Sequence, residues 1–408
     1  MMLPNGWKKS KIGETCSLLS GQDFPPNLYG NEEKGMPYIT GASNFAGNHI
    51  ILNRWTEHPK NIAKKGDILL VCKGSGFGIT AIADFEKAHI ARQVMALQKL
   101  NGVDRDFLYQ VVSMNVRNIK QKGCGLIPGI DRKTVLNIEY LLPPIEEQKK
   151  IAATLSVWDS AIEKNEKLIE AKIVQKKSLT CKLIENHNEV KFKLGNVTID
   201  KSKWEKKKFK DVFEFLPTNT CSRELMSTDE GSIKNIHYGD VLVKYAELLD
   251  VNSARIPCLK SSVDSSKMTF LQSGDIVIAD TAEDETVGKA VEILNIEDHL
   301  VVSGLHTMLC RPQKEIFYHG WLGYYINSKE FHRQLIPLIT GIKVSSIAKK
   351  DIVDTIVLIP SFHEQKIIVE TLSETNKELS LLKQQLENYK KQKQGLMQKL
   401  LTGQWRVK

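Results

Sequence analysis

The sequence predicts an α+β fold in which two pseudo-symmetric globular α/β domains are separated by two long antiparallel coiled-coil helices. The first observation is an internal repeat, because residues 143–184 align without a gap with residues 360–401. The second is the heptad spacing of apolar residues in both copies, which is typical of a coiled coil. The third is a weaker sequence similarity between the segments that precede the two copies.

The length and composition of the chain are those of a multidomain globular protein. Its 408 residues exceed one ordinary domain, and 41% hydrophobic with 26% charged residues suffice for a core in each domain. Lysine and arginine outnumber aspartate and glutamate by 57 to 48, which gives a formal charge of +9. This balance favours a polyanionic partner, although many basic proteins bind no nucleic acid.

The cysteines and the hydropathy of the chain indicate a reducing compartment and no membrane span. Seven cysteines are scattered along the sequence, none in a CxxC pair or beside a histidine pair with ligand spacing. No apolar run approaches the roughly 18–20 residues that cross a bilayer, and the N-terminus lacks the apolar segment of a signal peptide. We therefore expect no metal site and a cytoplasmic protein with reduced thiols.

The first globular domain is expected over residues 1–145. It opens with Gly6-Trp7-Lys8-Lys9, which leads into a strand-like stretch, and continues with a strand at Gly66-Asp67-Ile68-Leu69-Leu70. A helix is expected over residues 106–120. An apolar strand, Tyr140-Leu141-Leu142, is expected directly before the first repeated segment.

The first long helix is expected over residues 146–187. Glu146 and Glu147 follow the prolines and fill its first turn, where acidic residues interact favourably with the helix dipole. About 40 residues would span about 60 Å, which makes a single amphipathic helix packed on its own domain the weaker alternative. The predicted pairing positions are Ile151, Leu155, Trp158, Ile162, Ile169, Leu179 and Leu183.

The second globular domain is expected over residues 188–360, with elements that echo those of the first. Trp204 precedes a lysine-rich stretch, and residues 233–240 resemble residues 36–41. The segment Gly274-Asp275-Ile276-Val277-Ile278 matches the earlier Gly-Asp strand. A helix is expected over residues 318–334, and the strand Val357-Leu358-Ile359 closes the domain.

The second long helix is expected over residues 361–408 and repeats the opening of the first, since Glu364-Gln365-Lys366 matches Glu147-Gln148-Lys149. Each long helix ends where a new domain begins or the chain stops. An antiparallel pairing would therefore place the two domains at opposite ends of a rod, related by an approximate two-fold axis. The predicted pairing positions are Ile368, Leu372, Leu379, Leu382, Leu386, Tyr389, Leu396 and Leu400.

Polar residues interrupt both predicted seams, namely Asn165, Lys172, Lys176, Thr375 and Lys393. Such residues can fix the register of a coiled coil at a cost in stability. They could equally widen the pair where a partner protein docks, and the sequence leaves both interpretations open.

The chain shows no catalytic constellation. A methyltransferase that uses S-adenosylmethionine places an amide or carboxylate before its paired prolines, and neither residues 24–27 nor residues 142–145 do so. Residues 73–80 are glycine-rich but lack the lysine of a phosphate-binding loop. The carboxylates of residues 280–289 have no distinctive nuclease spacing. We therefore expect no enzyme activity, no metal and no cofactor.

The twice-used Glu-Gln-Lys opening, its long helix and the Gly-Asp-Ile strand of each domain resemble the specificity subunit of type I restriction–modification systems, over essentially the whole chain. The resemblance implies that each globular domain is a target-recognition domain for one half of a bipartite sequence in double-stranded DNA. It implies that the helices set the spacing between the halves and dock two modification (methyltransferase) subunits. Restriction subunits with an ATP-driven motor are further implied partners.

Basic and polar side chains near predicted turns are the candidates for DNA contact, because such groups reach phosphates and base edges. An ordinary exposed side chain is the alternative for each of them. In the first domain the candidates are Asn44, Arg54, Lys73, Ser75, Arg92, Gln93, Arg132 and Lys133. In the second domain they are His237, Lys244, Tyr245, Arg255, Lys343, Ser345 and Ser346.

The alternative function is a coiled-coil adaptor that binds only proteins, for which the basic charge is incidental. Footprinting of the assembled complex on DNA separates the two functions. Two protected tracts with an unprotected gap indicate the specificity subunit.

Overall fold

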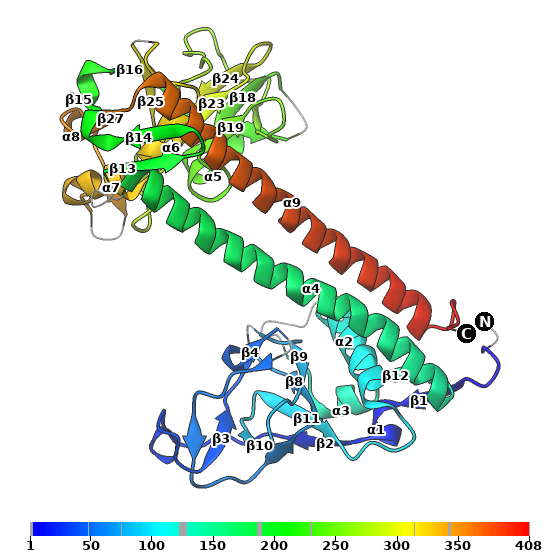
Figure 1. The fold of residues 1–408 in the computed structure, drawn as a ribbon. Helices are drawn as coiled ribbons and strands as arrows, with labels where there is room; N and C mark the ends of the chain where they lie inside the picture. The colour runs from blue at the N-terminus through cyan, green and yellow to red at the C-terminus, as the bar shows by residue number, and fades with distance from the viewer. Residues whose placement is uncertain are drawn as a thin grey trace. The chain divides into compact units, whose positions relative to one another are not determined.

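The chain folds into two compact units, each of which contains one globular domain and a part of both long helices (Figure 1). The structure is a computed structural model that describes residues 3–47, 49–74, 76–121, 129–185, 190–228, 231–313, 315–341 and 344–407. The first unit comprises residues 1–169 and 381–408, and the second unit comprises residues 170–380. The predicted α+β class, with two repeated domains and two long helices, is confirmed.

Two four-stranded sheets form most of the first globular domain. Its strands are β1 Lys8–Lys11, β2 Ser17–Ser20, β3 Met36–Ile39, β4 Phe45–Ala46, β5 His49–Ile50, β6 Trp55–Thr56, β7 Ile62–Lys64, β8 Ile68–Val71, β9 Thr80–Ile82, β10 Lys87–Ile90, β11 Val94–Gln98 and β12 Glu139–Leu142. One sheet has the order β2-β11-β8-β9 and the other the order β6-β3-β10-β7. The strand β1 pairs with β12 and so joins the start of the domain to its end.

The second globular domain contains a five-stranded and a four-stranded sheet. Its strands are β13 Lys191–Leu194, β14 Val197–Asp200, β15 Glu205–Lys208, β16 Phe213–Leu216, β17 Met226–Ser227, β18 Ile233–Ile236, β19 Leu248–Asp250, β20 Cys258–Leu259, β21 Ile276–Ala279, β22 Thr281–Ala282, β23 Ala290–Leu294, β24 Leu300–Ser303, β25 Thr307–Pro312, β26 Ser345–Ser346 and β27 Ile356–Ile359. The sheet orders are β16-β25-β21-β23-β19 and β17-β20-β18-β24.

The two domains share one framework of strand pairs. The antiparallel pair β8–β11 corresponds to β21–β25, and the parallel pair β3–β10 corresponds to β18–β24. The pair β15–β27 closes the second domain as β1–β12 closes the first. A buried tryptophan comes directly before the first strand of each closing pair, Trp7 before β1 and Trp204 before β15. The pseudo-symmetry predicted from the sequence therefore extends from the helices to the domain cores.

The repeated Gly-Asp pair begins equivalent strands for the same physical reason in both domains. Its glycines adopt φ of 88° and 91°, a backbone conformation in which a residue with a Cβ is strained. The aspartate that follows is held by the residue across the sheet. The carboxylate of Asp67 accepts from Gln98 Nε2 at 2.5 Å, and that of Asp275 accepts from Arg311 Nε at 2.8 Å.

The long helices lie where the repeat predicts them. The helices are α1 Ile12–Thr15, α2 Arg105–Gln121, α3 Arg132–Leu136, α4 Ile145–Thr180, α5 Tyr238–Val243, α6 Trp321–Ile326, α7 Lys329–Leu335, α8 Lys349–Ile352 and α9 Phe362–Leu401. A π-helical turn, Cys181–Glu185, follows α4. The helix expected over residues 106–120 corresponds to α2.

The prediction of a single helix over residues 318–334 is wrong, because this segment forms two helices, α6 and α7. The Asn327 side chain donates to the Ala290 carbonyl at 2.8 Å and accepts from its N–H at 3.0 Å. Ser328 then caps α7 through the N–H of Phe331. These polar side chains offer the backbone an alternative to a continuous helix.

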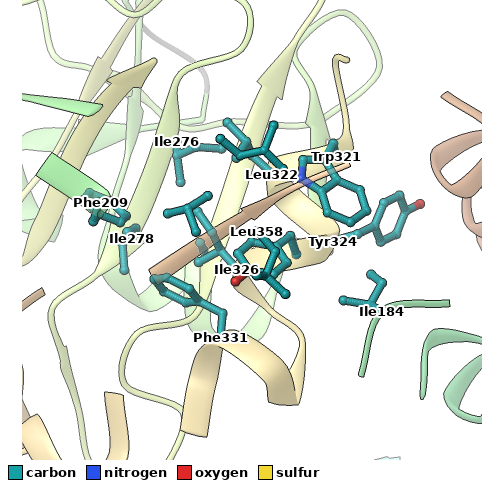
Figure 2. Packing of buried hydrophobic residues seen from close by; sticks show 14 of the residues in the cluster. Ile184, Phe209, Ile276, Ile278, Trp321, Leu322, Tyr324, Ile326, Phe331 and Leu358 are labelled. Carbon is teal, nitrogen blue, oxygen red and sulfur yellow. The ribbon is translucent and has the colours of Figure 1, made fainter. Parts of the chain in front are cut away.

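Each unit buries its own hydrophobic core, and each core includes residues of both long helices. In the second unit α6 places Trp321, Leu322 and Ile326 against Ile276 and Ile278 of β21 (Figure 2). The same cluster contains Ile184, which follows α4, and residues of the first turns of α9. In the first unit the start of α4 and the end of α9 share a cluster with α2.

No helix within the described ranges combines the length and the apolar character that a membrane span requires. Those ranges also contain no group of three or more histidine, cysteine, aspartate or glutamate side chains arranged to hold a metal ion.

Candidate nucleic-acid interface and helix pair

A buried glutamine fastens the start of each long helix to its own domain. In the first unit Gln148 Oε1 accepts from the Asp104 N–H at 2.7 Å, and its Nε2 donates at 2.9 Å to the carbonyl five residues earlier. In the second unit Gln365 accepts from the Tyr318 N–H at 2.7 Å and donates to its own fifth-preceding carbonyl at 2.9 Å. A side-chain amide can accept and donate at once, which explains why this residue is repeated.

The glutamate before each glutamine also has a structural role. The Glu147 carboxylate accepts from Trp7 Nε1 at 2.9 Å and from Arg406 Nε at 2.6 Å. Burial disfavours its charge, but the Arg406 guanidinium and the Trp7 N–H outweigh burial and lower the pKa of Glu147. The equivalent Glu364 caps α9 by accepting from the Ser361 N–H at 3.0 Å. In the first unit this motif therefore joins both ends of the chain to α4.

The two long helices run antiparallel within the first unit. The Trp158 and Tyr389 rings meet edge to face at 5.9 Å, and Asn165 Nδ2 donates to Gln385 Oε1 at 3.0 Å. As the residue number rises along α4, that of its partner on α9 falls. Apolar contacts near the end of α9 complete the pairing, through one cluster that contains Ile151, Leu155, Met397 and Leu400 and against which Leu396 packs.

The helices also run side by side in the second unit, where Lys172 Nζ lies 2.6 Å from Glu378 Oε2. One cluster there holds Leu183, Ile368 and Leu372, and Leu179 packs against it. None of the fifteen predicted pairing positions is exposed. Ile169 and Leu379 are buried, while Ile162, Leu382 and Leu386 are partly buried.

Lys393, which is buried, and Lys176, which is partly buried, are counterparts in the repeat, and both have intramolecular carboxylate partners. Lys393 pairs with Asp159 of α4, which also accepts from Gln110 of α2 at 2.8 Å. Lys176 pairs at 2.6 Å with Glu247, a residue of the second globular domain. These polar interruptions connect the helices to their domains, which favours the register interpretation over an open docking site.

In the first unit five predicted contact residues gather at one end of the β2-β11-β8-β9 sheet. We call residues 72–74, 91–93 and 129–133 the first loop edge. The Cys72 N–H donates to the Gln93 carbonyl at 2.8 Å, and the Ile130 N–H donates to the Cys72 carbonyl at 2.9 Å. The predicted residues on this edge are Lys73, Arg92, Gln93, Arg132 and Lys133, all of them exposed. Arg132 contacts the Leu18 carbonyl, and Arg92 Nε lies 2.8 Å from Asp23.

The remaining candidates of the first domain have other surroundings. Asn44 is fully buried and its amide bonds to Thr40, Ile51 and Asn53, so the structure argues against a DNA contact for it. Arg54 is half-buried over the Tyr29 ring, 5.5 Å from its centroid. Ser75 lies outside the described residues.

The second unit has an equivalent edge, residues 280–282, 304–306 and 345–350, which we call the second loop edge. The Asp280 N–H donates to the His306 carbonyl at 3.2 Å, and the Ile347 N–H donates to the Asp280 carbonyl at 2.9 Å. These bonds repeat those of the first loop edge. The predicted Ser345 and Ser346 lie there as β26, partly exposed. Lys343 lies outside the described residues.

The other candidates of the second domain gather around α5. His237 is 7% exposed and caps α5 through the Gly239 N–H at 3.2 Å, and burial lowers the pKa of its imidazole. Tyr245 is also buried, which raises the pKa of its phenol. For these two residues the structure favours a role within the fold. Lys244 and Arg255 are exposed, and Lys244 Nζ donates to the Arg255 carbonyl at 2.5 Å.

Three exposed residues of the second loop edge were not among the predicted contact residues. Lys349 and Lys350 are the repeat counterparts of Arg132 and Lys133, and His306 occupies the place of Gln93. The gapless repeat extends upstream into this segment. Its offset would have located both lysines, whereas the position of His306 depends on the strand register.

The fold and the two loop edges define a duplicated recognition scaffold, with one edge of polar and basic side chains on each of two equivalent domains. Comparison with known proteins identifies its class. The family model described as type I restriction modification DNA specificity domain matches residues 4–172 and 201–390. The chain therefore belongs to this family, which confirms the resemblance seen in the sequence.

Individual relatives agree with this assignment. The type I restriction enzyme MjaVIII specificity subunit of Methanocaldococcus jannaschii is 26% identical, over 100% of this chain and 95% of the relative. The S subunit of a type I restriction-modification system from M. genitalium has a similar fold, with a TM-score of 0.56, 17% identity and 98% of each chain covered. A chain from a structural study of type I R-M complex assembly and conformational transition has a TM-score of 0.59 at 17% identity, covering 98% of this chain and 99% of that one.

Proposed function

We propose that each globular domain reads one half of a bipartite DNA target through its loop edge. The observation that carries this proposal is the equivalence of the two edges, which present exposed Lys, Arg, Gln and His side chains at matching backbone positions. Lysine and arginine hold phosphates, and amide, imidazole and guanidinium groups read base edges in the major groove. Two readers in one chain would specify a longer site than one domain can.

The paired helices set the distance between the two half-sites and dock two modification subunits. Antiparallel contacts in each unit and the ion pairs of Lys393 and Lys176 support a stiff spacer, which would lose little ordering entropy on binding. Apolar side chains that face away from the seam support docking, because such patches mark protein interfaces. On α4 and α9 of the first unit these side chains are Val157, Leu168 and Leu381, which are 67%, 46% and 56% exposed.

The chain adds specificity and no chemistry of its own. Its modification subunits would carry the S-adenosylmethionine reaction, and restriction subunits would join the same cytoplasmic assembly. The domain limits that we propose are residues 1–145 and 188–360 for the two readers, and residues 146–187 and 361–408 for the helices.

Footprinting of the chain assembled with its modification subunits tests this function. We expect two short protected tracts in double-stranded DNA, separated by a gap of constant length that remains accessible. A complex without any DNA sequence preference would instead support the protein-binding adaptor. Methyl transfer from S-adenosylmethionine to DNA by the chain alone would contradict the non-catalytic assignment.

A further inference from the structure

The positive charge of the chain is divided unequally between the two globular domains. Residues 1–144 contain 18 lysines and arginines against 12 aspartates and glutamates, a formal charge of +6. Residues 188–360 contain 22 against 24, a formal charge of −2. Two domains with one framework therefore present DNA with opposite net charges.

The same difference appears at matched positions of the two loop edges. Lys73 forms a β-bridge with Gly129 in the first domain, and Thr281 pairs with Ser346 at the equivalent place in the second. A threonine therefore stands where the first domain has Lys73. The loop that follows is glycine-rich in the first domain, whereas in the second it is acidic and exposed, with Glu283 and Glu285 at its tip. Only Lys349 and Lys350 retain positive charge at the second edge.

Many cations of the second domain are already engaged within the fold. Lys234, Lys244 and Lys289 donate to backbone carbonyls at 2.9, 2.5 and 2.8 Å. Arg223 and Arg311 each lie 2.7 Å from a buried aspartate. On the first loop edge Arg92 and Arg132 are also engaged, with Asp23 and with the Leu18 carbonyl. Lys73 and Lys133 of the same edge are exposed, and neither side chain has a hydrogen-bond or ion-pair partner among the described residues.

We propose that the first domain anchors the complex on the phosphate backbone, while the second domain mainly discriminates between bases. This inference rests on the proposed DNA-reading function. Phosphate contacts supply affinity and its salt dependence but no sequence information. A domain with negative net charge gains little from phosphates, and the first domain compensates by holding it close to the duplex. In the second domain, the side chains of His306, Thr281 and Ser346 can donate hydrogen bonds to base edges or accept them.

The salt dependence of binding by the assembled complex tests this division. Kd is measured between 50 and 200 mM salt on DNA with both half-sites, for wild type, the Lys73→Gln/Lys133→Gln variant and the matched Lys349→Gln/Lys350→Gln variant. Each lost phosphate contact lowers the slope of log K against log salt by about 0.9. We expect the first variant to lower the slope by about 2, and the second to lower it by less than half as much.

A third variant, Glu283→Gln/Glu285→Gln, probes the second domain directly. We expect it to bind non-target DNA several-fold more tightly and to prefer the correct second half-site less. Equal slopes for the two lysine variants, or unchanged discrimination by the third, would overturn the division. Failure of the proposed function is distinguishable, because the wild-type complex would then bind target and scrambled DNA equally.

Discussion

At the scale of single residues, Glu292 links the stability of the second unit to pH. Its carboxylate is 1% exposed and accepts from the Gly320 and Gly323 N–H groups at 2.6 and 2.8 Å, at the start of α6. Burial raises the pKa of Glu292 from 4.5 to about 7, although these N–H groups oppose the shift. The first domain has an apolar residue, Ile82, at the equivalent strand position.

We predict that Glu292→Gln removes this pH dependence. The stabilisation by Glu292 is fully present below pH 4.5 and is lost as the pH rises to about 7, because the unfolded chain ionises first. The unfolding free energy of the variant minus that of wild type should therefore rise by on the order of 3 kcal/mol between pH 4.5 and pH 8. Denaturant titrations of both proteins at these pH values check it. A difference that does not change with pH would contradict it.

The repeated glutamine gives a second residue-scale prediction. Gln148→Leu leaves the Asp104 N–H and a buried carbonyl without partners, so we expect a loss of about 1–3 kcal/mol in unfolding free energy. Gln365→Leu should cause a similar loss in the second unit. Lys149→Ala is the matched control, because that side chain is exposed. If both glutamine variants were as stable as this control, the joint described for α4 and α9 would be wrong.

Residue-level contacts were the hardest feature to predict from the sequence. Asn44 and Tyr245 look like exposed polar groups near turns, but tertiary packing buries both. Burial depends on strand pairs that join distant segments, such as β3 with β10, and one sequence does not reveal this register. Lys73 and Gln93 do share an edge, although their contact with DNA stays a prediction.

At the scale of elements, periodicity located the long helices well. Apolar residues every three or four positions over five or six heptads admit few alternatives. Both α4 and α9 begin within one residue of the expected start and end seven residues before the expected end. The break between α6 and α7 was missed because it depends on the bond of Asn327 to Ala290, a strand residue distant in sequence. The partners of Lys393 and Lys176, which are Asp159 and Glu247, could not be predicted for the same reason, because they are also distant in sequence.

The pair of Lys393 with Asp159 gives the prediction at this scale. Lys393→Met leaves the partly buried Asp159 with Gln110 as its one remaining donor among the described residues. We therefore expect the unfolding free energy of the first unit to fall by about 1–3 kcal/mol. Adding Asp159→Asn, which copies the Asn376 of the second repeat, should restore part of this loss. Urea denaturation of the two single variants and the double variant measures the coupling. The exposed Lys391→Met is the control, and additive single effects would refute the interaction.

At the scale of the whole molecule, duplication organises the chain. The Glu-Gln joint, the Gly-Asp strand and the loop edges each occur twice, so one structural solution serves both domains. The sequence predicted this plan because framework residues are repeated. It could not predict the bases that each edge would read, because the side chains of the edges are not repeated. Thr281 and His306 occupy the places of Lys73 and Gln93. The edges differ in the side chains that a half-site would meet.

The spacer role makes the prediction at this scale. One heptad added at matching positions of α4 and α9 lengthens the pair by about 10 Å, which corresponds to about three base pairs of DNA. Genome-wide methylation mapping in cells that carry the chain and its modification subunits is the most direct measurement. We predict a bipartite motif with a fixed gap, and the same two half-sites with an altered gap for the lengthened chain. A single continuous motif, or a gap that the insertion leaves unchanged, would contradict two readers set apart by a helical spacer.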